Sequence, residues 1–122
     1  MYNIQVNNED AVLVLSGDVD LQTTADLKNE ISELQGVKTL DIKASGVNYI
    51  DSSGVAVLLM TRQHCMTNGI ELTLSVISTP VFRVLQIAKL DKLLPIDQVV
   101  DSEGGGLDNF GIDAAIKDDT GE

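Results

Sequence analysis

The segment Asp51-Ser52-Ser53-Gly54 has the residue types and spacing that best fit a chemical role in this sequence. It lies between a predicted buried strand and a predicted amphipathic helix. Asp and Ser are preferred at helix starts because their side-chain oxygens accept hydrogen bonds from the first backbone N–H groups. A hydroxyl there is also a candidate phosphate acceptor. The positive end of a helix tolerates an anion, and a phosphate adds about −1.5 to −2 charges to the surface. The segment therefore fits both a helix cap and a phosphorylation site.

Common catalytic motifs do not fit the sequence. Ser53 has Asp51 two residues before it and Val55 two residues after it, so it does not lie in a G-x-S-x-G nucleophile elbow. The only glycine cluster, residues 104–106, follows no predicted crossover strand, which argues against a P-loop or a dinucleotide-binding turn. We therefore expect no enzyme activity, no catalytic residue and no cofactor.

Metal sites fit equally poorly. A calcium loop beginning at Asp18 and Asp20 would need Gly where Thr23 stands and Glu where residue 29 is Asn. His64 and Cys65 adjoin on a predicted helix, where neighbouring side chains point about 100° apart. We expect both to be ordinary helix residues and expect no metal site.

Charge and hydropathy narrow the classes of partner. The 122 residues carry 19 acids and 8 bases, a net charge of −11, which disfavours nucleic acids and anionic membrane surfaces. The longest apolar run, residues 55–60, is far shorter than the ~20 residues that cross a bilayer. A single cysteine and a start without a signal-peptide pattern favour a reducing compartment. These features predict a soluble cytoplasmic protein with protein or small-molecule partners.

Hydrophobic periodicity predicts the element order β-β-α-β-α-β-α-β. Alternating or continuous apolar runs predict strands at residues 2–6, 11–15, 40–44 and 72–76, with a late or edge strand within 93–100. Helical spacing predicts one helix capped by Thr23 and stopped at Gly36, and another ended by Asn68-Gly69. A third is predicted with Thr79 as its cap and Pro80 at its first position.

This order predicts a single α/β domain with a mostly parallel, mixed sheet and an N-terminal hairpin. Polar Asp41 and Lys43 alternate with Leu40 and Ile42, so we expect the helices to cover mainly one face. We expect the domain to span residues 1–100. Residues 101–122 hold seven acids and one base and are rich in Gly, which predicts a mostly disordered acidic tail. Within it, a weakly amphipathic stretch could dock onto the domain or a partner; its apolar residues are Leu107, Phe110, Ile112, Ala115 and Ile116.

Over residues 2–100 the chain resembles the STAS domain family, as found in bacterial anti-sigma-factor antagonists. The resemblance rests on three segments: Gly17-Asp18-Val19-Asp20, Ser45-Gly46-Val47 through Tyr49-Ile50 into Asp51-Ser52-Ser53-Gly54, and Val84-Leu85 through Leu90. It implies that Ser53 is phosphorylated by a serine kinase that is also the anti-sigma factor. The unphosphorylated protein would bind that kinase, and a PP2C-type, metal-dependent phosphatase would reset it.

The resemblance and the residue chemistry together define a predicted site. Ser53 is the phospho-acceptor, Ser52 and Gly54 shape the turn, and Asp51 orients it by accepting backbone N–H groups. We expect Gly54 to let a kinase nucleotide approach closely, because it lacks a Cβ. The predicted partner-binding surface includes Asp18, Asp20, Thr23 and Val55.

Two alternative functions stay open. Small STAS proteins also serve as subunits of bacterial lipid-trafficking ABC transporters, where they contact the ATPase and often lack the switch serine. The second alternative is a ligand-sensing or enzymatic domain that uses the carboxylates around Asp51, although the chain offers no evident base or nucleotide loop. The intact Ser53 favours the phosphorylation switch.

Overall fold

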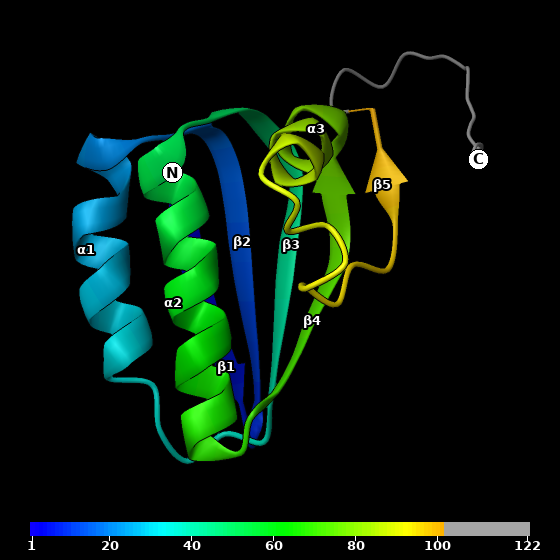
Figure 1. Cartoon of the computed structure of the whole chain (residues 1–122). Helices are drawn as coiled ribbons and strands as arrows, with labels where there is room; N and C mark the ends of the chain where they lie inside the picture. The colour runs from blue at the N-terminus through cyan, green and yellow to red at the C-terminus, as the bar shows by residue number, and fades with distance from the viewer. Residues whose placement is uncertain (102–122) are drawn as a thin grey trace.

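Five strands form one mixed sheet in the computed structural model, which describes residues 1–101 (Figure 1). The strands lie in chain order across the sheet: β1 (Tyr2–Asn7), β2 (Asp10–Val19), β3 (Thr39–Ile50), β4 (Glu71–Ser78) and β5 (Val99–Val100). β1 and β2 form the antiparallel hairpin, and every later pair of neighbours is parallel. The helices are α1 (Leu21–Ser32), α2 (Ser52–Asn68) and α3 (Thr79–Ile87). The predicted order and fold class are confirmed.

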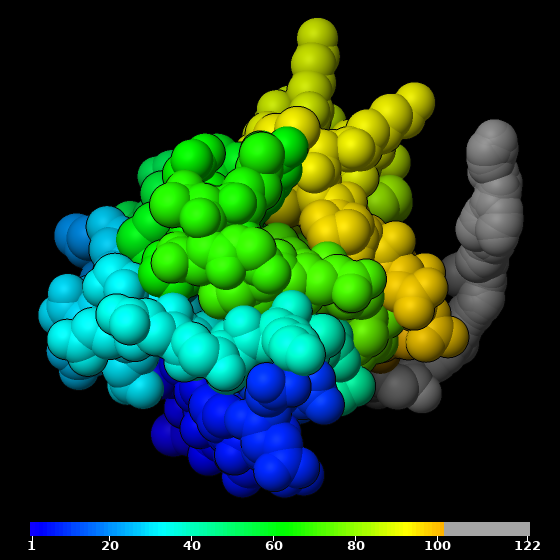
Figure 2. All heavy atoms as spheres, turned by 90° about the horizontal axis from the view of Figure 1, so that it is seen from below, coloured from blue at the N-terminus to red at the C-terminus, as the bar shows by residue number. Residues whose placement is uncertain are grey.

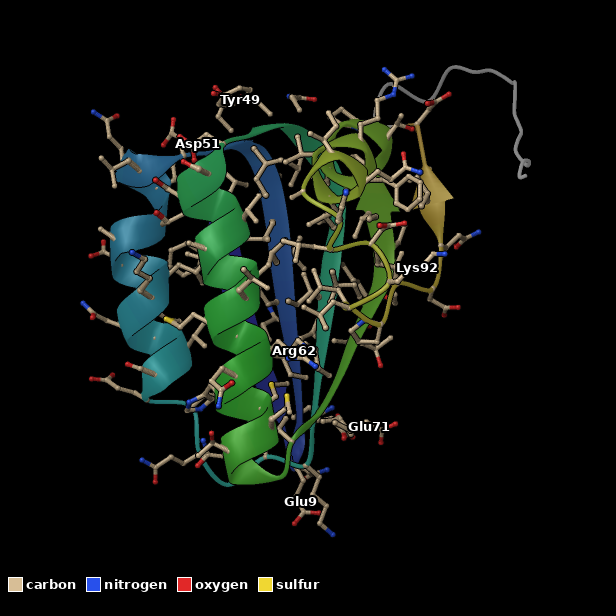
Figure 3. All side chains as sticks on the ribbon, viewed as in Figure 1. Glu9, Tyr49, Asp51, Arg62, Glu71 and Lys92 are labelled. Carbon is tan, nitrogen blue, oxygen red and sulfur yellow. The ribbon has the colours of Figure 1, made fainter. Side chains whose placement is uncertain are left out.

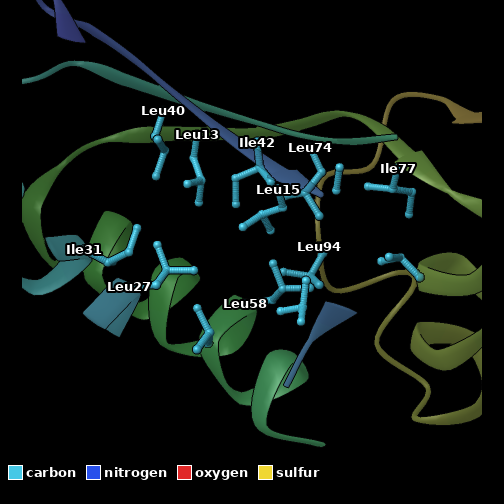
Figure 4. Close-up of a cluster of buried hydrophobic side chains, with 14 of the residues drawn as sticks. Leu13, Leu15, Leu27, Ile31, Leu40, Ile42, Leu58, Leu74, Ile77 and Leu94 are labelled. Atoms are coloured by element: carbon cyan, nitrogen blue, oxygen red, sulfur yellow. The ribbon is translucent and has the colours of Figure 1, made fainter. Parts of the chain in front are cut away.

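The helices lie on one face of the sheet, and the core lies between the two layers (Figure 1). Alternate residues of the central strands point toward α1 and α2, as Leu13, Ile42 and Leu74 do in Figure 4, and all three are fully buried. Leu27 and Ile31 of α1 belong to the same buried cluster. The opposite face keeps polar groups such as Asp41, whose carboxylate pairs with Lys43 at 3.3 Å. The predicted one-sided arrangement is therefore confirmed.

The predicted start and end of α1 were wrong. The cap is Asp20 rather than Thr23, and the helix ends at Ser32 with Glu33 as its C-cap, before the predicted stop at Gly36. Local chemistry explains the earlier start, because the Asp20 carboxylate accepts hydrogen bonds from two N–H groups of the first turn. Helix α1 therefore begins directly after β2.

The loop signal Ser45-Gly46 predicts a break after the strand expected at residues 40–44, but both residues are part of β3. In the β2–β3 pairing, Val14 lies opposite Lys43 and Ser16 lies opposite Gly46, so β3 has one extra residue between these pairs. A bulge of this kind lets a strand continue through residues that otherwise favour a turn. It extends β3 to Ile50, beside the first turn of α2.

The face that α2 buries also differs from the predicted one. Helical spacing predicts that Val55, Leu58, Leu59, Arg62 and Met66 share the buried face, whereas the buried residues are Gly54, Val57, Leu58, Thr61 and Cys65. Because residues 55–60 are all apolar, they cover every direction around the helix and periodicity cannot select one face. The end of α2 at Gly69, which adopts the left-handed conformation with φ 67°, is as predicted.

Helix α3 begins one residue earlier than predicted, and β5 is a short edge strand that begins late, as predicted. Ser78, not Thr79, is the N-cap of α3, which places Pro80 at the second helical position, and Ala88 lies exposed beyond its end. β5 contains only two residues, preceded by a single bridge between Leu74 and Ile96. Pro95 cannot donate to a strand ladder, which explains the late start.

Residues 102–122 lie outside the described part of the chain, so the predicted disorder of the tail and its amphipathic stretch stay predictions. No helix within residues 1–101 is long and apolar enough to cross a membrane.

Tyr2 ties β1 to α1, because its hydroxyl donates a hydrogen bond to a Glu30 carboxylate oxygen. This hydrogen bond is the main reason that the pKa of Tyr2 rises from 10.0 to about 12. Since the folded pKa is above the unfolded one, the stabilisation is fully present below pH 10 and is lost as the pH rises toward 12.

We therefore expect an absorbance titration of Tyr49→Phe, in which Tyr2 is the only tyrosine, to give a pKa near 12. Adding Glu30→Gln should move it back toward 10. A Tyr2 pKa near 10 in the Tyr49→Phe protein, with circular dichroism showing it folded, would contradict the interaction.

Candidate functional site

Asp51 caps α2 and fixes the geometry of the serines that follow it. Its carboxylate oxygen Oδ1 accepts hydrogen bonds from the backbone N–H groups of Ser53, at 2.9 Å, and Gly54, at 3.2 Å. The Asp51 carbonyl oxygen accepts the N–H of Val55 at 3.0 Å, which starts the regular helix. Asp51 thus has the hydrogen bonds expected of a residue that orients the turn.

The junction between β2 and α1 is built by a similar cap at the same end of the sheet. The Asp20 carboxylate accepts the N–H of Thr23, while the N–H of Asp20 donates to the Thr23 hydroxyl oxygen at 2.9 Å. This reciprocal capping box holds both residues in place. Thr23 is half-buried, and its hydroxyl takes part in the cap. Asp18, two residues before Asp20 in β2, is exposed.

A backbone hydrogen bond joins the two junctions, from the N–H of Asp51 to the carbonyl oxygen of Val19 at 3.2 Å. Gly54 packs against the same junction, beside Val19 at the end of β2 and Ile50 at the end of β3. A Cβ on Gly54 would lie 2.5 Å from Ile50 Cγ1 and 2.9 Å from both Val19 Cγ1 and the Val19 carbonyl oxygen. Gly54 is buried, so the expectation that it opens the surface to a nucleotide was wrong. Its missing side chain instead lets α2 approach the ends of β2 and β3.

Ser52 and Ser53 occupy the first two positions of α2. Ser52 is exposed and Ser53 is partly exposed, and no hydrogen bond within residues 1–101 involves the Ser53 hydroxyl. Asp51 already accepts hydrogen bonds from the Ser53 and Gly54 amides, so a phosphate on Ser53 could use these two amides only by displacing the Asp51 carboxylate.

The remaining predicted partner-binding residue, Val55, is partly buried and packs against the core. Two apolar residues that the sequence did not predict for this surface are more exposed. Leu21, the first residue of α1, is 68% exposed, and Tyr49, near the end of β3, is 53% exposed. Figure 3 shows Tyr49 beside Asp51, at the end of the molecule opposite Glu9. With the cap at Asp20, Leu21 becomes the first residue of α1 and falls outside its buried stripe. The sequence would then have indicated that Leu21 is exposed.

The histidine lies too far along α2 to activate Ser53. His64 lies eleven residue steps after Ser53, which corresponds to about 16 Å along a helix axis. His64 Nε2 instead lies 2.8 Å from the carbonyl oxygen of Leu34 and so links α2 to the segment after α1. Cys65 is buried, and burial raises the pKa of its thiol. Within residues 1–101, no three His, Cys, Asp or Glu side chains gather closely enough to hold a metal ion.

The contact of Gly54 with Val19 and Ile50 generates a stability prediction. Alanine is normally the better helix former by about 1 kcal/mol, so Gly54→Ala would stabilise an open site. Here the added methyl overlaps Ile50 and the Val19 backbone, and we expect a loss of about 1–3 kcal/mol in the free energy of unfolding, measured by urea denaturation. Ser52→Ala, at an exposed position of the same turn, is the control and should change it by less than about 0.5 kcal/mol. A Gly54→Ala protein as stable as the parent would contradict the packing.

Comparison with known proteins identifies the family. A family model described as "Mlab, STAS domain" matches residues 3–95, which is most of the chain. The unphosphorylated anti-sigma factor antagonist SpoIIAA has a similar fold, with a TM-score of 0.69 and 22% identity over 79% of this chain and 87% of that one. An anti-sigma factor antagonist from Mycobacterium paratuberculosis gives 0.65 and 23%, covering 79% and 83%. The Bacillus cell fate determinant SpoIIAA in its phosphorylated form gives 0.64 and 22%, covering 79% and 90%. The resemblance inferred from the sequence is confirmed, and this chain belongs to the STAS domain family.

Proposed function

We propose that this chain is a phosphorylation-controlled partner-switching protein of the anti-sigma-factor-antagonist type. It binds a serine kinase that is also an anti-sigma factor while Ser53 is unphosphorylated, and phosphorylation of Ser53 releases it. A PP2C-type phosphatase restores the binding form. The observation that carries the proposal is the position of Ser53: its hydroxyl is free of hydrogen bonds within residues 1–101, on a turn already held by Asp51.

The preformed turn supports a switch that acts through charge. The Asp51 carboxylate satisfies the Ser53 and Gly54 amides before any phosphate is added. The phosphate therefore adds about −1.5 to −2 charges beside an existing carboxylate, while the buried packing of Gly54 stays unchanged. Phosphorylation thus changes the surface that a partner meets more than it changes the fold.

The partner-binding surface we propose combines apolar and acidic groups at one end of the sheet. Leu21 and Tyr49 supply exposed apolar area, and Asp18 and Asp20 supply charge, next to the turn that carries Ser53. A partner that covers this surface must remove water from the acids and from any phosphate. Because an unpaired phosphate is costly to bury, its addition weakens binding. Thr23 acts by holding Asp20, and Val55 by packing beneath the turn.

The surface supports binding rather than catalysis. The Ser53 hydroxyl has no hydrogen-bond partner within residues 1–101, the Oδ1 of the neighbouring Asp51 carboxylate accepts from two backbone amides, and His64 is about 16 Å away along the helix. Membership of the STAS family is common to partner switches and to the transporter-subunit alternative, so the fold does not separate them. The intact Ser53 on an accessible turn is the feature that favours the switch.

Incubation of the full chain with the candidate serine kinase and Mg·ATP tests the proposal, with the phosphate mapped by mass spectrometry. We expect one phosphate, on Ser53. Ser53→Ala should accept none and still bind the kinase, whereas Ser53→Asp should bind more weakly because of its added charge. Ser52→Ala is the matched control at the neighbouring hydroxyl, and it should be phosphorylated like the parent.

Phosphate on Ser52 instead of Ser53, or none with a kinase that is active on other substrates, would exclude the switch at Ser53. Pulldown of the full chain from native lysate separates the two functions. A kinase among the captured proteins supports the switch, and an ABC-transporter ATPase with no kinase supports the transporter alternative.

A further inference from the structure

A groove lies between the C-terminal half of α2, the first part of β4 and the segment that leads from α3 to β5. Its volume is about 470 Å³, within the range of protein binding pockets. Apolar side chains from all three segments line it: Cys65, Met66, Ile70, Leu72, Leu93, Leu94 and Pro95. In Figure 2, α2 (green) lies beside the segment around residues 90–100 (yellow to orange).

The groove exposes apolar area and unpaired positive charge together. Met66 is 60% exposed and Leu93 is 45% exposed, although both line an apolar surface. Arg62 and Lys92 also line the groove, from α2 and from the α3–β5 segment, as labelled in Figure 3. The ion pairs between described residues join Lys38 to Glu9 and Lys43 to Asp41, so neither groove cation has a carboxylate partner within residues 1–101. An acidic, apolar peptide segment fits this combination.

We propose that residues 107–116 of this same chain occupy the groove. This segment carries Leu107, Phe110, Ile112 and Ile116 for the apolar walls, and Asp108 and Asp113 for the two cations. It contains no basic residue, so its charge is complementary to that of Arg62 and Lys92.

The length of the chain allows this arrangement. β5 ends at Val100 opposite Ser78, whereas the groove contacts Leu72, six residues earlier on β4, or about 20 Å at 3.3 Å per residue. Nine residue steps from Asp101 to Phe110 span up to about 30 Å. Residues 104–106 are all Gly, the residue whose backbone has the fewest conformational restrictions.

The groove is remote from Ser53. Met66 lies thirteen residue steps after Ser53, which is about 19 Å along the helix. Occupation of the groove therefore leaves the proposed phosphorylation turn open, and the proposal stands independently of the switch.

Fluorescence of the full-length chain tests this proposal, because the natural sequence contains no Trp. Phe110→Trp places a single indole in the tail. We expect its emission maximum to lie at shorter wavelength than that of a free peptide of residues 101–122 with the same substitution. The difference should be independent of protein concentration.

A second substitution in the Phe110→Trp chain locates the contact. Leu93→Asp, at a groove residue that is 45% exposed, should return the emission to that of the free peptide. Val14→Asp is the matched control, on the open face of the sheet and 43% exposed, and should leave the emission unchanged. Circular dichroism and urea midpoints verify that both variants are folded.

Emission equal to that of the free peptide in the Phe110→Trp chain would overturn the proposal. So would a shift that persists with Leu93→Asp, because the tail would then contact another surface. A shift that grows with protein concentration would assign the groove to a second copy of the chain instead.

Discussion

The close approach of Gly54 to Val19 and Ile50 is the contact on which the exposed end of the domain depends. It brings the first turn of α2 against the ends of β2 and β3, where the N–H of Asp51 reaches the carbonyl oxygen of Val19. Two loops that are distant in sequence thereby become one surface. Any side chain larger than hydrogen at position 54 must push these elements apart, and Ser53 would move with them.

Much of the fold could be predicted from the sequence, because alternation and helical spacing are local patterns that each element carries itself. The hairpin, the parallel strands and the stop at Gly69 follow from such patterns. The predictions were wrong where contacts with neighbouring elements, rather than the local sequence, determine the structure. A bulge extends β3 through Ser45 and Gly46, and the apolar run of α2 leaves its buried face to be selected by the sheet.

At the candidate site too, local features could be predicted and contacts between distant segments could not. Asp51 as the cap of α2 was predictable because capping involves only the next few residues. The role of Gly54 was not, since its constraint comes from Val19, which is 35 residues away in sequence. The exposure of Tyr49 also depends on the irregular pairing of β3 with β2, which breaks simple alternation.

In the switch that we propose, phosphorylation of Ser53 adds charge to a preformed surface without repacking the core beneath it. Comparing the amide NMR spectra of the full chain with serine and with phosphoserine at position 53 tests this most directly. The proposed switch predicts chemical-shift changes confined to the turn around Asp51–Val55 and the neighbouring Val19 and Asp20, with the amides of β4 and of the C-terminal half of α2 unmoved. Shifts spread through β4 and the buried residues of α2 would contradict it.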